Sequence, residues 1–574
     1  MKNLLVYLKG YKKECVLAPL FKMLEALFEL FVPFVVASII DDGIIKENTS
    51  HIVKMVIVLV ALATIGLSCT LFAQYFSAKA SCGFVAKIRH ALFGHISSLT
   101  YQELDTLGNS TLITRMTNDA NQVQTGVNLT LRLFMRSPVI VFGALIMAIV
   151  VDPSLEVSSI FIFTILALSL VVFGIMLITI PLYKKVQAGL DSATLTTREN
   201  LSGARVIRAF GLESVESQKF KKKTELLNKA QIFVGRISAL MNPLTFVVVN
   251  LSVCVLIYNG AISVEHGNLS QGEVIALYNY MSQILIELVK LANLIITMTK
   301  ASASAKRISE VFEIKPSQEI SSNNEKINDF SVEFKNASLT YNGSSVSSLE
   351  NISFFASKGE TVGIIGGTGS GKTTLINMIS RFYDATSGAV YVNGQDVKSY
   401  ESENLRQRVG IVPQKAVLFK GSLRDNLKWG DENASDDDIL KAIETAQASD
   451  VLKSKPEGLD FLVEEGGKNL SGGQRQRFTI ARALVGKPEI LILDDSSSAL
   501  DYLTDFNLRK ALANLDYKPT LFIVSQRTAS VQEADKIIVL DDGKIAGIGT
   551  HTELLHSCVV YEEIYNSQFK KEGV

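Results

Sequence analysis

Six long apolar stretches constrain the fold of this chain more than any other sequence feature. They lie near 15–40, 53–77, 133–151, 155–180, 239–263 and 272–299. Each is close to or above the ~20 residues that a helix needs to cross a bilayer. A buried helical core is the alternative, but the stretch 158–180 contains no charged residue. We therefore predict a membrane domain with six transmembrane helices.

The charge distribution separates this region from the rest of the chain. Charged residues number 45 in positions 1–300 and 69 in positions 301–574, so only the second part has the composition of a soluble domain. Over the whole chain, 57 basic residues balance 57 acidic ones, which argues against nucleic-acid binding. We predict an α-helical transmembrane domain over 1–315, a polar linker over 316–329 and an α/β domain over 330–574.

Basic residues predict the orientation in a plasma (inner) membrane. Lysines and arginines concentrate near the N-terminus and in the loops 74–132 and 181–236, whereas the opposite loops contain only Lys46 and Lys54. Both termini and the two long loops are therefore expected to be cytoplasmic. The two loops keep helical periodicity, which predicts helices that continue out of the membrane and turn back. Residues 4–13 resemble an interfacial helix.

Two carboxylates lie within the first predicted span. Glu25 and Glu29 are four residues apart and share one helix face, with Lys22 one turn before Glu25. Ionisable groups at membrane depth usually face a water-filled cavity or pair with another group. Contact with a substrate in such a cavity and an ion pair both remain open as interpretations.

The most specific motif follows a β-rich run at 361–365 and precedes a helical run. It fits GxxxxGK[ST], and its residues are Gly366, Gly367, Thr368, Gly369, Ser370, Gly371, Lys372, Thr373 and Thr374. Glycines let the backbone wrap a phosphate, so that N–H groups and the helix N-terminus point at the anion. Lys372 is expected to reach the β- and γ-phosphates of ATP, and the Thr373 hydroxyl to ligate Mg²⁺.

Two further motifs complete the pattern in this domain. A second β-rich run at 489–493 ends in Asp494 and Asp495. An acidic residue that ends such a strand beside a phosphate-binding loop is the expected Mg²⁺ partner. Between the two strands, an LSGGQ turn precedes a helical run and offers another anion-binding helix N-terminus. The turn contains Ser471, Gly472, Gly473 and Gln474.

The combination of these motifs resembles a half-size ABC exporter, in which one six-helix membrane domain is fused to one ATPase domain. The resemblance covers nearly the whole chain. It implies that Tyr341 stacks on adenine, that Gln414 is the Q-loop residue beside Mg²⁺, and that Asp501 belongs to the D-loop. Segments 109–115 and 210–219 resemble the two coupling helices. ATPase domains of this family pack head to tail, so the LSGGQ segment of one chain completes the ATP site of another.

Two positions depart from the family pattern, and both concern hydrolysis. Asp495 stands where hydrolytic members have a glutamate, and Gln526 stands where they have the switch histidine. A displacement of ~1 Å can cost ~100-fold in rate. An amide can donate a hydrogen bond, but it cannot carry charge. This pairing resembles the degenerate site of heterodimeric ABC exporters; a working site with unusual residues is the alternative.

The resemblance therefore implies one subunit of an ATP-driven exporter of hydrophobic or amphiphilic compounds, with ATP and Mg²⁺ as cofactors. Its partners would be membrane lipids and a second half-transporter that supplies the Walker B glutamate and the switch histidine. An ATP-gated or sensory membrane protein without transport is an alternative, as is a homodimeric exporter. The complete signature favours transport, because a sensor has no need to complete a hydrolytic site. Apolar spans suit drugs or lipids, but they equally suit helix packing.

Overall fold

The computed structural model describes residues 2–318 and 328–569, so most of the predicted linker lies outside the described residues. The chain divides into two units. The first contains residues up to Ser97 together with Ser110–Ile314. The second contains Ser98–Asn109 together with the described residues from Lys315 onward. A short piece of the first long loop thus belongs with the second unit.

Six helices of the described chain are long and apolar enough to cross a membrane, which confirms the six predicted spans. The second of them, α2, has 50 residues, about 75 Å, far more than a bilayer requires. The elements of this unit are η1 (Lys2–Tyr11), α1 (Lys12–Ser38), η2 (Ile39–Ile44), α2 (Thr49–Ser98), α4 (Asn109–Thr114), η3 (Arg115–Asp119), α5 (Ala120–Leu133), α6 (Arg136–Val151), α7 (Leu155–Ser202), α8 (Ala204–Ala209), α9 (Glu213–Ala239), α10 (Met241–Glu265) and α11 (Gln271–Glu313). The predicted interfacial segment is a 3₁₀ helix, η1, that leads directly into α1.

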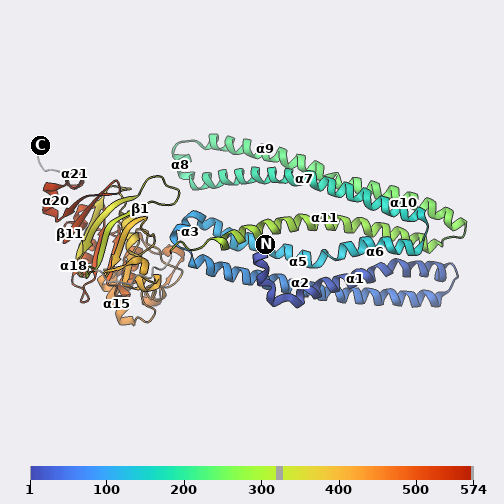
Figure 1. The fold of residues 1–574 in the computed structure, drawn as a ribbon, viewed down its shortest axis with the longest axis horizontal. Helices are drawn as coiled ribbons and strands as arrows, with labels where there is room; N and C mark the ends of the chain where they lie inside the picture. The colour runs from blue at the N-terminus through green and yellow to red at the C-terminus, as the bar shows by residue number, and fades with distance from the viewer. Residues whose placement is uncertain (1, 319–327, 570–574) are drawn as a thin grey trace. The chain divides into compact units, whose positions relative to one another are not determined.

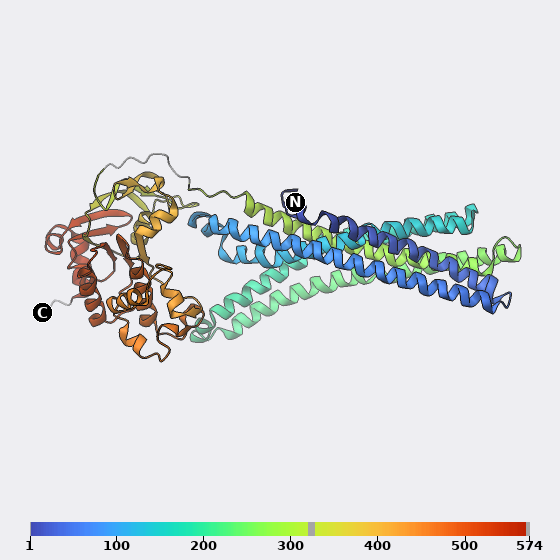
Figure 2. The same cartoon turned by 90° about the horizontal axis from the view of Figure 1, so that it is seen from below.

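Helix α11 is the centre of the membrane unit. It contacts α1, α5, α6, α7 and α10 (Figures 1 and 2). A capping box between Ser270 and Glu273 begins the helix, and Asp41 also accepts a hydrogen bond from the Gly272 N–H at 2.8 Å. Inside the bundle, the buried Tyr280 hydroxyl donates to the carbonyl of Leu30 at 2.7 Å. Such a bond satisfies a polar group that lipid could not satisfy.

The turns of the two long loops differ from the segments that resembled coupling helices. In the first loop, a capping box of Thr100 and Glu103 begins α3 (Tyr101–Leu107), and Gly108, at φ 73°, ends it. Segment 109–115 instead begins the returning helix. Within the second unit, the Tyr101 ring lies 4.4 Å from that of Phe382. In the second loop the chain turns through α8, which joins α7 to α9 (Figure 1).

The second unit is an α/β domain built on two main sheets, as predicted. The strand orders are β2-β1-β4-β5 and β12-β11-β3-β10-β9-β6. The strands are β1 (Val332–Leu339), β2 (Leu349–Ala356), β3 (Thr361–Gly366), β4 (Ser387–Val392), β5 (Gln395–Asp396), β6 (Val409–Val412), β7 (Gly421–Ser422), β8 (Leu462–Val463), β9 (Ile490–Asp494), β10 (Thr520–Val524), β11 (Lys536–Asp541) and β12 (Lys544–Gly549). The remaining helical elements are α12 (Lys372–Ile379), η4 (Val397–Ser399), α13 (Ser402–Arg408), α14 (Leu423–Leu427), α15 (Asp436–Thr445), α16 (Ser449–Lys453), η5 (Gly458–Asp460), η6 (Glu465–Gly467), α17 (Gly472–Val485), α18 (Tyr502–Ala513), α19 (Thr528–Val531), α20 (His551–Ser557) and α21 (Val559–Gln568).

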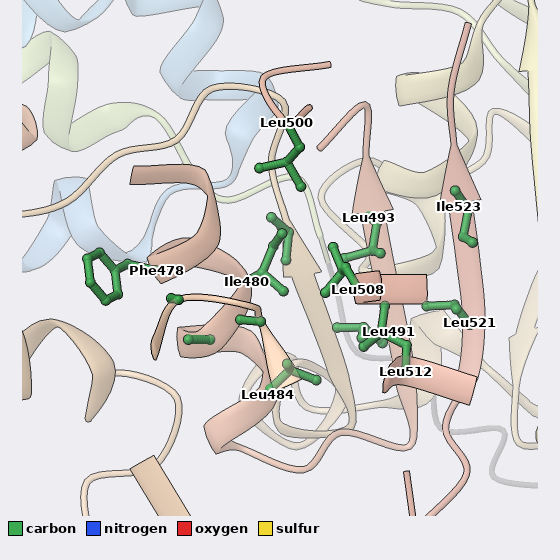
Figure 3. Packing of buried hydrophobic residues seen from close by; sticks show 14 of the residues in the cluster. Phe478, Ile480, Leu484, Leu491, Leu493, Leu500, Leu508, Leu512, Leu521 and Ile523 are labelled. Carbon is green, nitrogen blue, oxygen red and sulfur yellow. The ribbon is translucent and has the colours of Figure 1, made fainter. Parts of the chain in front are cut away.

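Strand β9 is buried on both faces, which is typical of a central parallel strand. Successive side chains alternate between two hydrophobic clusters. Leu491 and Leu493 join α17 and α18 in one cluster (Figure 3), whereas Ile490 and Ile492 belong to the other. This packing holds the end of β9 rigidly, and Asp494 is its last residue.

Candidate nucleotide site

Three adjacent parallel strands deliver the candidate site residues to one edge of the sheet. In the register of β3, β10 and β9, Val524 pairs with Ile364 on one side and with Asp494 on the other. Because carboxyl ends of parallel strands meet at the same edge, the loops that follow these strands converge there. The phosphate-binding loop follows β3, Asp495 follows β9, and Gln526 follows β10.

The phosphate-binding loop has the backbone that its glycines predict. Gly369 and Gly371 have φ of 85° and 96°, in the left-handed region where a side chain is strained. A Cβ at Gly371 would also approach Leu349 Cδ2 to 2.7 Å. Gly371 is the N-cap of α12, so the helix begins where a phosphate would bind.

Lys372 keeps its ammonium group at the loop. Its Nζ donates to the carbonyls of Gly367 at 2.5 Å and Gly366 at 2.9 Å. Burial lowers the pKa of Lys372, and the nearby carboxylates of Asp495 and Asp494 oppose this shift. Nζ also donates to Ser370 Oγ at 3.4 Å, so all these partners are uncharged oxygens. A desolvated cation held by such groups can exchange these bonds for stronger ones to phosphate oxygens.

Hydroxyl and carboxylate oxygens fit a magnesium ion. The Thr373 hydroxyl donates to Asp494 Oδ2 at 3.1 Å, and Gln414 lines the same cavity. Burial is the main cause that raises the pKa of Asp494; the Thr373 hydrogen bond lowers it, and neighbouring Asp495 raises it further. A bound cation would favour the charged carboxylate. Oxygen donors of this kind suit Mg²⁺, which usually keeps waters and substrate phosphates as its other ligands.

A cavity of about 440 Å³ collects most of the predicted residues. Those that line it are Thr368, Gly369, Gly371, Lys372, Thr373, Thr374, Gln414, Asp494, Asp495 and Gln526. Val346, Asp542 and Gly543 also line it, although the sequence analysis missed them. Asp542 and Gly543 follow β11, and the sheet order that brings β11 beside β3 accounts for their place. Val346 follows β1 in the other sheet, and only the tertiary structure shows that it lines this cavity.

Asp495 and Gln526 both lie at this cavity. Asp495 has φ 45°, and its N–H donates to the Val524 carbonyl at 2.9 Å. Gln414 Nε2 donates to Asp495 Oδ2 at 3.3 Å. Burial raises the pKa of Asp495, and the Gln414 hydrogen bond is the first of the opposing causes. The Gln526 carbonyl accepts a hydrogen bond from Gln568 Nε2 at 2.6 Å, which ties the strand end to α21.

Tyr341 is absent from the described residues that line this cavity. Its hydroxyl lies 3.0 Å from Thr374 Oγ1, and its ring meets Tyr383 edge-on at 5.0 Å. It therefore lies next to the phosphate-binding loop, and adenine stacking stays a prediction.

The signature segment is built as a helix N-terminus and does not line this cavity in the described chain. Ser471 Oγ accepts from the Gln474 N–H at 3.3 Å, while Gln474 Oε1 accepts from the Ser471 N–H at 2.9 Å. This reciprocal pair begins α17. Ser471 and Gly472 are exposed, and none of the four signature residues lines the cavity in the described chain. Asp501, the predicted D-loop residue, caps α18 by accepting a hydrogen bond from the Thr504 N–H at 2.9 Å.

In the membrane unit, Glu25 and Glu29 are ion-paired. Lys22 Nζ lies 2.6 Å from Glu25 Oε2, and Arg136 NH2 lies 2.6 Å from Glu29 Oε2. Arg136 also contacts Glu287 at 2.5 Å. The sequence analysis missed Arg136 and Glu287, although their charges inside predicted spans were the available signal.

The fold and the site define a membrane protein with a phosphate-binding-loop ATPase domain, and the comparisons agree. The family model "ABC transporter transmembrane region" matches residues 15–288, and "ABC transporter" matches 349–498. "Uncharacterized ABC transporter ATP-binding protein YfiB" of Bacillus subtilis is 34% identical over all of this chain and 99% of its own length. The chain therefore belongs to the ABC transporters, as a multi-pass membrane protein with one transmembrane domain fused to one ATPase domain.

Two further comparisons describe the kind of transporter. The "ATP-dependent lipid A-core flippase" of Syntrophus aciditrophicus is 28% identical over 94% of this chain and 90% of its own length. A solved structure titled "Structure of a bacterial Atm1-family ABC exporter with ATP bound" has a TM-score of 0.81 at 22% identity. It covers 98% of this chain and 99% of that one. The chain therefore has the exporter fold.

Replacement of Lys372 by alanine is expected to weaken ATP binding by about 10- to 100-fold, because a charge-assisted contact to phosphate is lost. Site-resolved binding of a photoreactive ATP analogue to the full-length chain measures this. Lys358→Ala, at an exposed lysine that does not line the cavity, is the matched control. Equal affinity of the Lys372→Ala variant and the wild type would contradict the assignment.

Proposed function

We propose that this chain is the degenerate-site subunit of a heterodimeric ABC exporter. It binds ATP and Mg²⁺ at its own cavity and turns the nucleotide over slowly. Its signature completes a second site, whose Walker B glutamate and switch histidine belong to a different half-transporter. The complex exports hydrophobic or amphiphilic compounds from the plasma membrane, with both termini and the ATPase domain in the cytoplasm.

The observation that carries this proposal is the mixture of intact and altered groups at one cavity. Lys372, Thr373 and Asp494 line this cavity, and Thr373 contacts Asp494 beside the phosphate-binding loop, which supports nucleotide binding. Asp495 and Gln526 lie at the same cavity, where water activation and γ-phosphate contact would be needed. Asp495 has one methylene fewer than a glutamate, and positioning is most of what phosphoryl transfer asks of the protein. Binding and hydrolysis are therefore expected to separate.

The exposed signature supports completion of a site in a second chain. Ser471 and Gly472 are accessible at the N-terminus of α17, where backbone N–H groups favour an anion. A complete LSGGQ signature can function only where it contacts a nucleotide, and in this proposal that nucleotide is bound to a second chain. This observation favours a transporter subunit over an ATP-gated sensor, and it leaves a homodimeric exporter as the second candidate.

The substrate class rests on the membrane helices and on one relative. Large apolar side chains are exposed along α2, α7 and α10, where lipid would surround them. The relative from Syntrophus aciditrophicus is named as a lipid A-core flippase. The name of this relative supports a hydrophobic or amphiphilic substrate for this chain, and the exposed apolar side chains support the membrane setting in which such a substrate is reached.

Restoration of the two altered groups tests the proposal. The full-length chain alone is expected to bind ATP but hydrolyse it slowly. Asp495→Glu combined with Gln526→His is expected to raise steady-state hydrolysis at least about 10-fold, because both groups return to their hydrolytic form. Asp495→Asn with Gln526→His is the matched control and should stay slow. A wild-type chain that hydrolyses ATP as fast as the restored variant would overturn the degenerate-site assignment and favour the homodimer.

A further inference from the structure

Six charged side chains meet inside the membrane unit. They lie within three predicted spans, 15–40, 133–151 and 272–299. Lys22, Glu25 and Glu29 are on α1, Arg136 is on α6, and Glu287 and Lys290 are on α11. Three cations face three anions, so the cluster is neutral as a whole. We call this set the charge cluster.

Four members of the cluster form a line of alternating sign, and Glu25 with Lys22 forms a branch at Arg136. Glu29 contacts Arg136 at 2.6 Å, Arg136 contacts Glu287 at 2.5 Å, and Lys290 contacts the same Glu287 oxygen at 2.8 Å. The inner members are buried: the side chains of Arg136 and Glu287 are 8% and 3% exposed. The outer members are open: Glu29 is 39% and Lys290 is 42% exposed. A carboxylate and an ammonium thus form the accessible ends of one buried chain of charges.

The buried members of the charge cluster lie close together, but not every polar atom among them has a hydrogen bond. Ser137 Oγ donates to Glu287 Oε2 at 2.9 Å. Arg136 Nε lies 3.7 Å from Glu25 Oε1 and makes no hydrogen bond within the described residues. Lys22 compensates Glu25 at 2.6 Å. The buried charges are therefore compensated by one another, and the side chains of Glu29 and Lys290 stay partly exposed while paired with Arg136 and Glu287.

We propose that Glu29 and Lys290 are a recognition site for a zwitterionic headgroup, an ammonium joined to a phosphate or carboxylate, on an amphiphilic substrate. Glu29 receives the ammonium, and Lys290 receives the anionic group. This inference rests on the proposed export of amphiphilic compounds and names their headgroup.

The need to keep the charge cluster neutral at membrane depth favours a zwitterionic headgroup over a singly charged one. A purely anionic or cationic headgroup would add a net charge to a neutral, largely desolvated cluster, and uncompensated charge in such surroundings is costly. A zwitterion adds no net charge and matches both open ends. An uncharged headgroup would displace water from Glu29 and Lys290 without giving either side chain an ionic contact in return.

Four photoreactive amphiphiles with one acyl chain and different headgroups test this inference. The headgroups are phosphocholine, trimethylammonium, phosphate and glycerol. Crosslinking to the full-length chain in maltoside micelles is measured against probe concentration, and labelled peptides of α1, α6 and α11 are identified by mass spectrometry. The phosphocholine probe is expected to label α1 and α11 with an apparent Kd about 10-fold below that of the other three.

Two single substitutions then separate the two ends. Glu29→Gln should weaken the phosphocholine and trimethylammonium probes by about 10-fold and leave the phosphate probe unchanged. Lys290→Gln should weaken the phosphocholine and phosphate probes and leave the trimethylammonium probe unchanged. The unchanged probe reports that each variant is folded. Glu14→Gln and Lys79→Gln are matched controls expected to leave all four probes unchanged. They alter an ion pair between α1 and α2 in which the Glu14 side chain is 14% and the Lys79 side chain 48% exposed.

Three outcomes would overturn the inference. Equal labelling by all four probes would show that only the acyl chain binds, without headgroup recognition. This result would not contradict the proposed exporter function. Wild-type affinity of the phosphocholine probe in both variants means that the headgroup binds elsewhere. Failure of every probe to label the chain would contradict the proposed amphiphilic substrate as well, so the two failures are distinguishable.

Discussion

In the proposed heterodimer, Ser471→Ala is expected to lower steady-state ATP hydrolysis by about 100-fold, because it would remove a hydroxyl contact to the γ-phosphate in the proposed partner's site. Asp495→Asn should lower it less than about twofold, since its own site contributes little turnover. The difference follows from the geometry: Ser471 is exposed at the start of α17, whereas Asp495 lies at this chain's own cavity.

Ser471 also caps a helix, so a structural loss must be separated from a catalytic one. Ser435 caps α15 in the same way, through the Asp438 N–H at 3.2 Å. Loss of such a cap costs about 1 kcal/mol. Ser435→Ala is therefore the matched control: it should show a similar loss of stability and near-normal hydrolysis. If Asp495→Asn proves as damaging as Ser471→Ala, the asymmetric assignment is wrong.

Arg136→Met is expected to cost about 3–5 kcal/mol of unfolding free energy, because it leaves buried Glu287 and half-buried Glu29 without their shared cation. The side chain of Glu287 is only 3% exposed, so water cannot replace the lost partner, and Lys290 can compensate only one of its oxygens. Thermal unfolding of the full-length chain in micelles, followed by a thiol-reactive dye, measures the loss.

Two companion variants show whether burial is the cause. Lys46→Met removes an exposed ion pair with Asp42 and should leave the unfolding midpoint nearly unchanged. Arg136→Met combined with Glu29→Gln and Glu287→Gln should recover part of the loss, since neutral amides no longer need a cation. An Arg136→Met variant as stable as Lys46→Met would show that the charge cluster contributes nothing to the fold.

Features encoded by neighbouring residues could be predicted from the sequence. Continuous apolar stretches identify the six long helices because lipid exposure demands apolar residues along the whole span. The phosphate-binding loop and the start of α17 follow from glycines and a serine that act on the adjacent backbone. The carboxyl end of β9 could be placed because Asp494 directly ends a buried run. The spacing of Glu25 and Lys22 likewise indicated a local pair.

Contacts between distant segments were decided only by the tertiary structure. Arg136 and Glu287 are 151 positions apart, and helical spacing rules reach only three or four residues. The place of α3 in the second unit, and that of Tyr341 beside Thr374, depend on packing that no local pattern encodes. The sequence by itself therefore determined which segments cross a membrane and which loop can bind a phosphate. The tertiary structure decided which charges meet and which motif residues share a cavity, because those distances are set by how whole helices and strands pack.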